Sequence, residues 1–210
     1  MHFGMFSGGR LPITWHEANY VDRLPMTSMP LRPVHSLGYP GRTYKFFNGS
    51  TVYPFGYGLS YTKFNYTLVS SQSSLPINLN KLQHCRDLDY DSDSFKPECP
   101  AVLVDDLECN KYIEFEVEVQ NVGSKDGDEV VIVYSNPPAG ITDAPIKQVI
   151  GFKRVFVKAG ESQNVKFALD ACKSLGIVDY NAYKLLPSGG HTIVVGDGVV
   201  SFPIQVSFDY

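Results

Sequence analysis

The sequence has no run of roughly 18 apolar residues, so it predicts no transmembrane helix and no membrane partner. It also lacks an excess of basic residues. Its 18 Lys and Arg stand against 22 Asp and Glu, a formal net charge of -4, which argues against a nucleic-acid partner. Charged residues make up only 19% of the chain and apolar residues 43%, so the chain is not disordered and can build a core.

Motifs of common catalytic and cofactor sites are missing as well. His16-Glu17 opens like a zinc-protease motif, but position 20 is Tyr and not the second His. Residues 56–61 lack the third Gly of a dinucleotide loop. No Gly-x-Ser-x-Gly elbow, P-loop or Cys-x-x-Cys pair occurs. The sequence therefore predicts no cofactor and no metal.

Residues 87–98 are the one stretch that partly fits a calcium loop. Alternating aspartates begin at Asp87, and Glu98 occupies position 12. Position 6 is Ser92, where the sharp turn requires Gly, and no flanking helices are predicted. A solvated acidic loop is the preferred interpretation.

Turn-forming and aromatic residues are abundant. The 210 residues include 18 Gly and 14 Pro, which indicate many turns, and 13 Tyr and 13 Phe, which favour strands. From residue 112 onward, short segments alternate apolar and polar residues between turn signals, with no helical period. Gly151 is predicted to mark a bulge. The predicted strands are residues 62–69, 113–120, 129–135, 148–157, 163–169, 191–196 and 201–208.

This pattern predicts a mostly β fold, an antiparallel immunoglobulin-like β-sandwich. A polar insertion at about residues 70–111 interrupts it and is expected to be a loop stapled to the sandwich. Residues 1–60 differ because Gly, Pro and aromatic residues cluster there without periodicity. They are expected to form an extended segment that packs on the sandwich or on a further part of the protein.

Several features are typical of a secreted protein. Asn48 and Asn65 begin N-glycosylation sequons. The cysteine count is even, which is consistent with two disulfides. Cys85 and Cys99 bracket one loop and are the first pair to expect, although all three pairings stay open. The four cysteines are Cys85, Cys99, Cys109 and Cys172.

The start of the chain does not fit a secretory leader. Residues 1–10 have neither a positive leader nor an apolar stretch of 7–15 residues. If the protein is secreted, the chain is expected to be the C-terminal end of something longer, or a truncated gene product.

Three ordered blocks in the first third of the chain carry a family resemblance. They are residues 9–15 (GRLPITW), 38–47 (GYPGRTYKFF) and 52–61 (VYPFGYGLSY). Together they resemble the C-terminal signature of family 3 glycoside hydrolases, in the plant β-xylosidase and α-L-arabinofuranosidase branch. Residues 151–155 (GFKRV), 159–161, 186–189 and 195–197 are similar to the fibronectin type III-like domain of that family.

The resemblance covers about residues 8–208 and implies a domain division. Residues 1–60 would be the tail of an α/β sandwich domain and its linker, and residues 61–210 the fibronectin-like domain. Residues 1–6 depart from the family pattern, which suggests a truncation or a misplaced first exon.

The resemblance also implies an activity, an exo-β-xylosidase or α-L-arabinofuranosidase acting on cell-wall xylan or arabinan. A retaining glycosidase needs two carboxyl groups about 5–5.5 Å apart. In the family these belong to the barrel and to an earlier part of the α/β sandwich domain, so no catalytic residue is assigned and the isolated chain is expected to be inactive. Its expected partners are those two domains and a xylo- or arabino-oligosaccharide.

Four residues near the signature blocks could border a sugar site, because aromatic faces stack on sugars and Arg donates to hydroxyls. The favoured alternative is that they pack and lock the linker to the body. Glu17 and Asp22 are the only acids nearby and are interpreted as solvated or salt-bridged. The four residues are Trp15, Tyr39, Arg42 and Tyr44.

An alternative from another class is a stand-alone carbohydrate- or protein-binding module without catalysis. Such a module should expose a row of aromatic residues on one sheet face. The polar face of residues 113–120 instead carries three glutamates and a glutamine, which disfavours this alternative.

Overall fold

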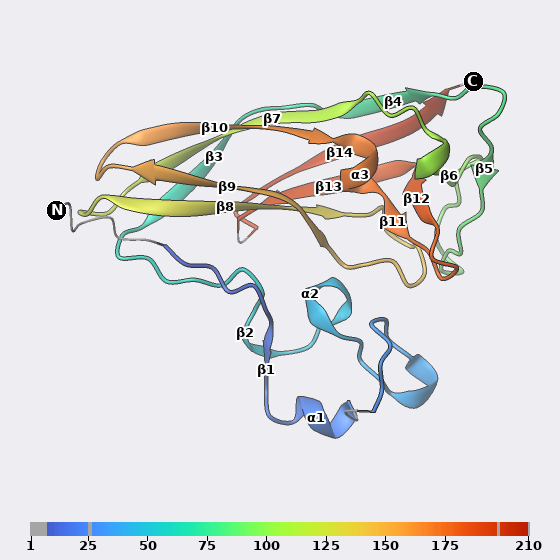
Figure 1. The fold of residues 1–210 in the computed structure, drawn as a ribbon, viewed down its shortest axis with the longest axis horizontal. Coiled ribbons are helices and arrows are strands. Elements are labelled where there is room, and N and C mark those ends of the chain that lie inside the picture. The colour runs from blue at the N-terminus through green and yellow to red at the C-terminus, as the bar shows by residue number, and fades with distance from the viewer. Residues whose placement is uncertain (1–7, 25–26, 197, 210) are drawn as a thin grey trace.

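Two β-sheets stack to form the larger part of the molecule, and a smaller lobe hangs below them (Figure 1). The structure is a computed structural model that describes residues 8–24, 27–196 and 198–209. The expected departure from the family at residues 1–6 lies outside the described residues.

The first sheet contains three antiparallel strands in the order β10-β7-β3. In the central strand β7, Ile113, Phe115, Val117 and Val119 are buried, and the residues between them face outward. This alternation follows from the two-residue period of a strand. The strands are β3 (Phe64–Ser71), β7 (Tyr112–Asn121) and β10 (Ser162–Asp170).

The second sheet contains five strands in the order β4-β14-β13-β8-β9. All neighbours are antiparallel except β14 and β4, which are parallel. The inward rows of both sheets form one core, in which Phe115 stacks on Phe167 at 4.9 Å between ring centroids. The strands are β4 (Ser74–Asn78), β8 (Gly127–Asn136), β9 (Gln148–Val157), β13 (Gly189–Val195) and β14 (Val200–Asp209).

The predicted sandwich is therefore confirmed, and each predicted strand is found within a few residues of its expected bounds. The bulge at Gly151 is also confirmed. Val133 pairs with Gly151 but the next residue, Tyr134, pairs with Val149, so Ile150 is the extra residue on β9.

The insertion at 70–111 is not only a loop, because it supplies β4 to the second sheet. Leu75 and Ile77 of β4 are buried, while Pro76 between them is exposed. Proline cannot donate to a ladder, so this segment does not look like a strand in the sequence. It is tolerated because β4 lies at the edge of its sheet.

A small third sheet, in the order β11-β12-β6-β5, closes one end of the sandwich (Figure 1). It joins two strands of the insertion to two strands from the segment after β10. None of the helices in the described residues is long and apolar enough to cross a membrane. The elements are β5 (Cys85–Arg86), β6 (Ala101–Leu103), η2 (Val104–Asp106), α3 (Ala171–Leu175), β11 (Ile177–Val178) and β12 (Lys184–Pro187).

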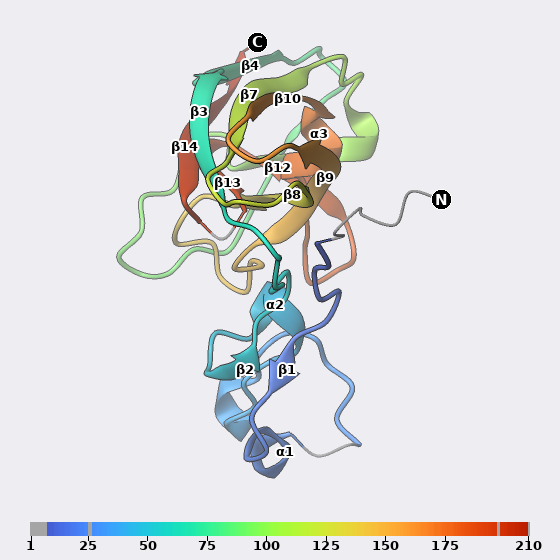
Figure 2. The ribbon, with the colours of Figure 1, turned by 90° about the vertical axis from the view of Figure 1, so that its left-hand side faces the viewer.

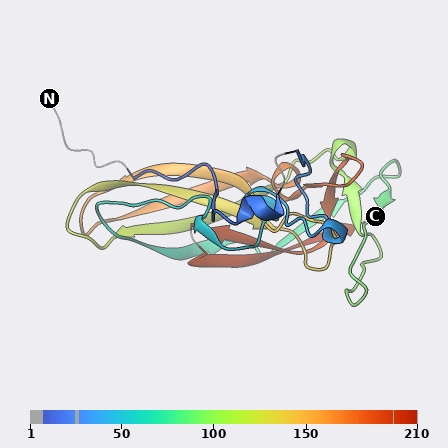
Figure 3. The ribbon, with the colours of Figure 1, turned by 90° about the horizontal axis from the view of Figure 1, so that it is seen from below.

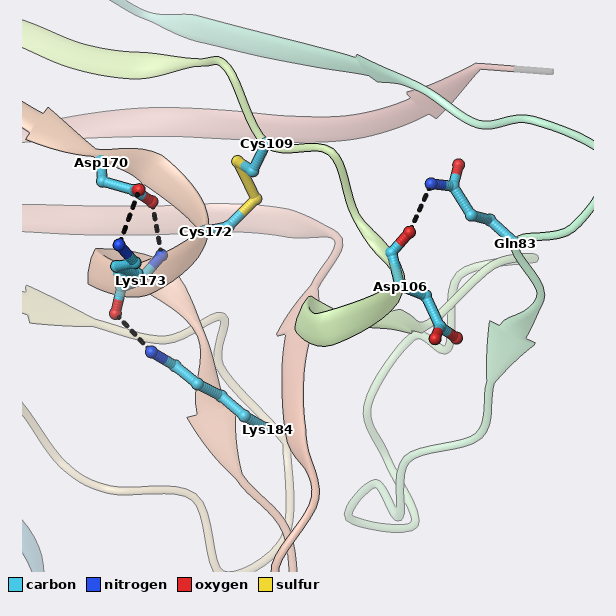
Figure 4. Close-up of a disulfide and its surroundings, with 7 residues drawn as sticks. All are labelled: Gln83, Asp106, Cys109, Asp170, Cys172, Lys173 and Lys184. Carbon is cyan, nitrogen blue, oxygen red and sulfur yellow. Dashed lines mark hydrogen bonds and ion pairs between the residues drawn. A yellow bond between two sulfur atoms is a disulfide. The ribbon is translucent and has the colours of Figure 1, made fainter.

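One disulfide closes a loop within the insertion, and a second ties the insertion to the sandwich. Cys85 pairs with Cys99, the pair favoured by their shared loop, and Cys109 pairs with Cys172 at the start of α3. Figure 4 shows the second disulfide between the end of the insertion and the helix. Beside it, Gln83 donates to the Asp106 carbonyl oxygen at 2.6 Å. This hydrogen bond connects two distant parts of the insertion.

The lobe hangs from the sandwich on two chain segments and has no large sheet of its own (Figure 2). Seen from below, it covers only part of the length of the sandwich (Figure 3). Its elements are short, in keeping with the irregular segment expected from the sequence. They are β1 (Trp15–His16), α1 (Tyr20–Arg23), η1 (His35–Leu37), α2 (Thr43–Phe46) and β2 (Thr51–Tyr53).

A buried ion pair joins the lobe to the sandwich. Glu129 occupies an inward position of β8 and is 1% exposed. Arg10 donates to the Glu129 carboxylate, and the Tyr66 hydroxyl of β3 donates to the same oxygen. A buried carboxylate requires such partners, so the sandwich needs the segment before β1.

Replacing Arg10 with Met should lower the free energy of unfolding by about 3–5 kcal/mol, because Glu129 would stay buried without its cation. The double variant Arg10→Met, Glu129→Leu should recover much of that loss, since no charge is then buried. Urea unfolding of the three proteins measures both values. Equal stability of the single variant and the parent chain would contradict the role of the pair.

The burial of His191 leads us to expect that the free energy of unfolding depends on pH. Its side chain is 1% exposed on β13, and Nε2 donates to the Pro187 carbonyl oxygen at 3.0 Å. Among the described residues, Nδ1 has no hydrogen-bond partner. Burial lowers the pKa of His191 from 6.5 to about 4, because the charged form loses its hydration.

The free energy of unfolding should therefore be highest above pH 6.5 and fall as the pH drops toward 4, since only the unfolded chain then takes up the proton. Between pH 7 and pH 4.5 the loss due to His191 should be about 2–3 kcal/mol. Urea unfolding at both pH values, compared with His191→Gln, isolates this share. An identical pH slope in the variant would refute it.

Candidate functional site

The three signature blocks come together in the lobe. Leu11 of the first block exchanges backbone hydrogen bonds with the third. Its N–H donates to the Tyr57 carbonyl oxygen at 2.8 Å, and its carbonyl oxygen accepts from the Gly56 N–H at 2.9 Å. Gly58 permits this approach, because a Cβ there would lie 1.9 Å from the Gly9 carbonyl oxygen. The middle block forms α2 beside them.

These blocks enclose a pocket of about 310 Å³. Most of its wall is apolar or aromatic, and its polar groups come from Thr14, His16 and Arg42 together with hydroxyls. Thr43 lines it with a φ of 62°, a left-handed conformation that is strained for a β-branched residue. The lining residues are Pro12, Ile13, Thr14, His16, Tyr20, Arg42, Thr43, Tyr44 and Phe55.

Two polar atoms of the pocket residues are buried and have no hydrogen-bond partner within the described part of the chain. They are Oγ1 of Thr14 and Nδ1 of His16. The His16 ring stacks on Tyr20 at 3.7 Å and meets Phe47 edge-on at 4.6 Å. Burial lowers the pKa of His16, so its ring is neutral at pH 7 and Nδ1 can accept or donate one hydrogen bond.

Tyr39 and Arg42 form an internal brace. Tyr39 is 4% exposed and its hydroxyl donates to the Pro30 carbonyl oxygen. Arg42 donates from Nε to the Tyr39 hydroxyl at 2.9 Å and from its guanidinium to the Ser28 carbonyl oxygen. These contacts hold the loop before α2 in place, while one side of Arg42 lines the pocket.

Tyr44 packs against the sandwich and connects the lobe to it. Its ring stacks on Phe55 at 4.2 Å and meets Tyr134 of β8 edge-on at 6.2 Å. Its hydroxyl accepts from the Val149 N–H of β9 at 3.2 Å. The Ile146 N–H donates to the Lys45 carbonyl oxygen at 2.6 Å nearby. Tyr44 thus supports the packing interpretation more than the sugar-border one.

Trp15 lies apart from the other three predicted residues. It is 49% exposed on β1 and meets Tyr53 of β2 edge-on at 5.8 Å. The four residues therefore do not form one cluster, since Trp15 is outside the pocket and Tyr39 lies behind it.

No carboxylate lines the pocket. Glu17 is exposed between β1 and α1, Asp22 is exposed on α1, and neither lines the pocket. Nor do any three His, Cys, Asp or Glu residues in the described ranges lie close enough to hold a metal. Asp87 of the acidic loop instead pairs with Lys96. The pocket can bind a small group by packing and hydrogen bonds, but it holds no acid and nucleophile for hydrolysis.

Sequence reasoning missed Thr14, His16, Tyr20, Thr43 and Phe55 as pocket residues. In the sequence, His16 stands out only as the first residue of an incomplete zinc-protease motif, and the others carry no motif. Their common origin in or beside the signature blocks was the available signal, because the blocks had to meet somewhere in the fold.

Comparisons with known proteins identify the family. A model of the fibronectin type III-like domain matches residues 129–199. β-D-xylosidase 1 of Arabidopsis thaliana is 41% identical over 90% of this chain and 24% of its own length. β-Xylosidase/α-L-arabinofuranosidase 2 of Medicago sativa subsp. varia is 35% identical over 94% of this chain and 24% of its own. A solved GH3 exo-β-xylosidase (XlnD) with a xylobiose aziridine probe superposes with a TM-score of 0.74 at 26% identity, over 96% of this chain and 24% of that one.

The chain is a C-terminal portion of a family 3 glycoside hydrolase. The resemblance to the plant β-xylosidase and α-L-arabinofuranosidase branch and to its fibronectin type III-like domain is thus confirmed. The chain spans about a quarter of the length of the curated relatives it matches.

The lobe of this family 3 hydrolase portion should loosen when Tyr44 is replaced with Ala. The change removes the ring between Phe55 and Tyr134 and leaves the Val149 N–H unsatisfied, at a cost of about 2 kcal/mol in local stability. Hydrogen exchange of the Ile146 and Val149 amides should then accelerate roughly 30-fold. Tyr44→Phe keeps the ring and should have a smaller effect. Unchanged protection of the Ile146 and Val149 amides in Tyr44→Ala would mean that Tyr44 does not hold the lobe to the sandwich.

Proposed function

We propose that the chain is the C-terminal part of a secreted exo-acting β-xylosidase or α-L-arabinofuranosidase that releases pentoses from cell-wall xylan or arabinan. In this role the fibronectin-like sandwich stabilises the catalytic parts and performs no chemistry itself. The observation that carries the proposal is the match to plant β-xylosidases over at least nine-tenths of this chain.

We infer further that residues 1–60 are the tail of an α/β sandwich domain with its linker, and that the fibronectin-like domain begins near residue 61. Several apolar side chains of the lobe are exposed although the lobe has little core of its own. The β1–β2 ribbon has only two strands, which is too few to be stable alone. Both features fit a piece completed by preceding chain. The exposed residues include Ile13, Val21, Met29, Leu37 and Leu59.

A chimera tests the enzymatic proposal. This chain should replace the C-terminal quarter of Arabidopsis β-D-xylosidase 1, and the isolated chain should be assayed beside it. Chromogenic β-xyloside and α-arabinofuranoside should be hydrolysed by the chimera and left intact by the isolated chain. A β-glucoside should be a poor substrate for both.

The matched control is the same chimera with Arg10→Met, which should unfold at a lower temperature because the lobe loses its anchor to Glu129. Turnover by the folded isolated chain would overturn the proposal that both catalytic carboxylates lie outside it. A folded chimera without activity on either pentoside would overturn the proposal that this chain can form the C-terminal part of such a hydrolase.

Secretion is supported by both sequons and by the disulfides. Asn65 is exposed on the outer face of β3, and Asn48 is exposed in the loop after α2. Expression through a secretory pathway should therefore add two N-glycans, seen as a mass loss after peptide N-glycosidase treatment. Asn48→Gln and Asn65→Gln should each remove one. A chain secreted without glycan would refute the predicted glycosylation of Asn48 and Asn65.

A further inference from the structure

The turn between β11 and β12, residues 179–183, projects from the small third sheet at the end of the sandwich. Its backbone is fixed by hydrogen bonds. The Asp179 N–H donates to the Tyr183 carbonyl oxygen at 2.9 Å, and the Tyr183 N–H donates to the Asp179 carboxylate at 2.8 Å. Ala182 adopts a left-handed φ of 67°. The turn therefore presents its side chains in a defined arrangement.

Two tyrosines on this turn are exposed. Tyr180 is 89% exposed and Tyr183 is 57% exposed, so neither contributes much to the core. An exposed tyrosine has an apolar ring and a polar tip, and its ring keeps only two side-chain torsions to be ordered on binding. Two such rings on a rigid turn can stack on the C–H faces of sugar rings.

A pocket of about 250 Å³ lies against the turn. Tyr183 forms one wall, and Leu103 of β6 and Leu185 of β12 give it an apolar part. A second hollow of about 160 Å³ shares Asp87, Asp179 and Asn181 with it and is also lined by Tyr180. The two hollows therefore lie side by side along the turn, and together they are called the groove here.

The polar groups of this groove include both hydrogen-bond donors and hydrogen-bond acceptors. Carboxylate acceptors come from Asp87, Asp89, Asp143 and Asp179, donors come from Arg32 and Arg86, and Asn181 supplies one of each. Asp87 also pairs with Lys96. Adjacent sugar hydroxyls each donate and accept, so they match such a mixed set. An anionic ligand does not, because the groove carries four aspartates against two arginines.

We propose that this turn groove, formed by Arg86, Asp87, Asp179, Tyr180, Asn181 and Tyr183, binds a segment of a neutral pentose polysaccharide. The stacking rings, the apolar part of the pocket and the mixed donors and acceptors carry the proposal. The choice of xylan or arabinan as the sugar rests on the proposed function. Beside the groove, Arg32 of the lobe donates to the carbonyl oxygens of Asp143 and Val178, so the groove has a fixed position relative to the lobe.

Affinity electrophoresis of the 210-residue chain tests the proposal, in gels with soluble arabinoxylan, linear arabinan, a soluble β-glucan or no polysaccharide. The parent chain should be retarded by at least one of the two pentosans. The variant Tyr180→Ala, Tyr183→Ala should bind at least 10-fold more weakly, and Asn181→Ala should weaken binding as well. Tyr112→Ala is the matched control, since Tyr112 is 54% exposed on β7 and lines neither hollow.

Thermal unfolding should be the same for the parent chain, the double variant and the control, which separates lost binding from lost folding. No retardation of the parent chain, or equal retardation of the double variant, would overturn the proposal. Retardation by a β-glucan alone would overturn the pentose assignment. Hydrolysis by the chimera is measured separately, so an inactive chimera beside a chain that binds pentosan would refute the enzymatic role and leave the groove standing.

Discussion

The buried carboxylate of Glu129 is the constraint on which the arrangement of the chain depends. It stands at a core-facing position of β8, where the alternation would otherwise place a valine or isoleucine. Such a charge is stable only with a cation and a hydroxyl beside it, which Arg10 and Tyr66 supply. Because Arg10 lies in the first signature block, the lobe and the sandwich are held together at the point where the chain enters the fold.

Two further sets of contacts also hold the lobe against the sandwich. Tyr44 reaches from α2 to β8 and β9, and Arg32 reaches from the lobe to the carbonyl oxygens beside β11. The sandwich thus contacts the lobe at three separate places, through Arg10, Tyr44 and Arg32. These contacts fix the position of the lobe relative to the fibronectin-like sandwich.

The lobe contains polar atoms in its pocket that the described residues leave unpaired. Its pocket ends in two buried polar atoms, on Thr14 and His16, that find no partner among the described residues. Buried polar groups in folded proteins are usually paired, by protein atoms or by water. The sandwich shares this feature at Nδ1 of His191, but it has a large continuous core, and the Cys109–Cys172 disulfide ties its insertion to the start of α3.

The sequence by itself determined the sandwich, because a strand with one dry face must alternate, and residues 113–120 do so without exception. It also determined the family, since the three signature blocks are linear patterns. Only the tertiary structure decided that residues 74–78 form a strand, because an edge position excuses Pro76 from donating. It also separated Trp15, Tyr39, Arg42 and Tyr44 into different roles. Which side chains face a pocket depends on contacts between distant segments, and local periodicity carries no information about these.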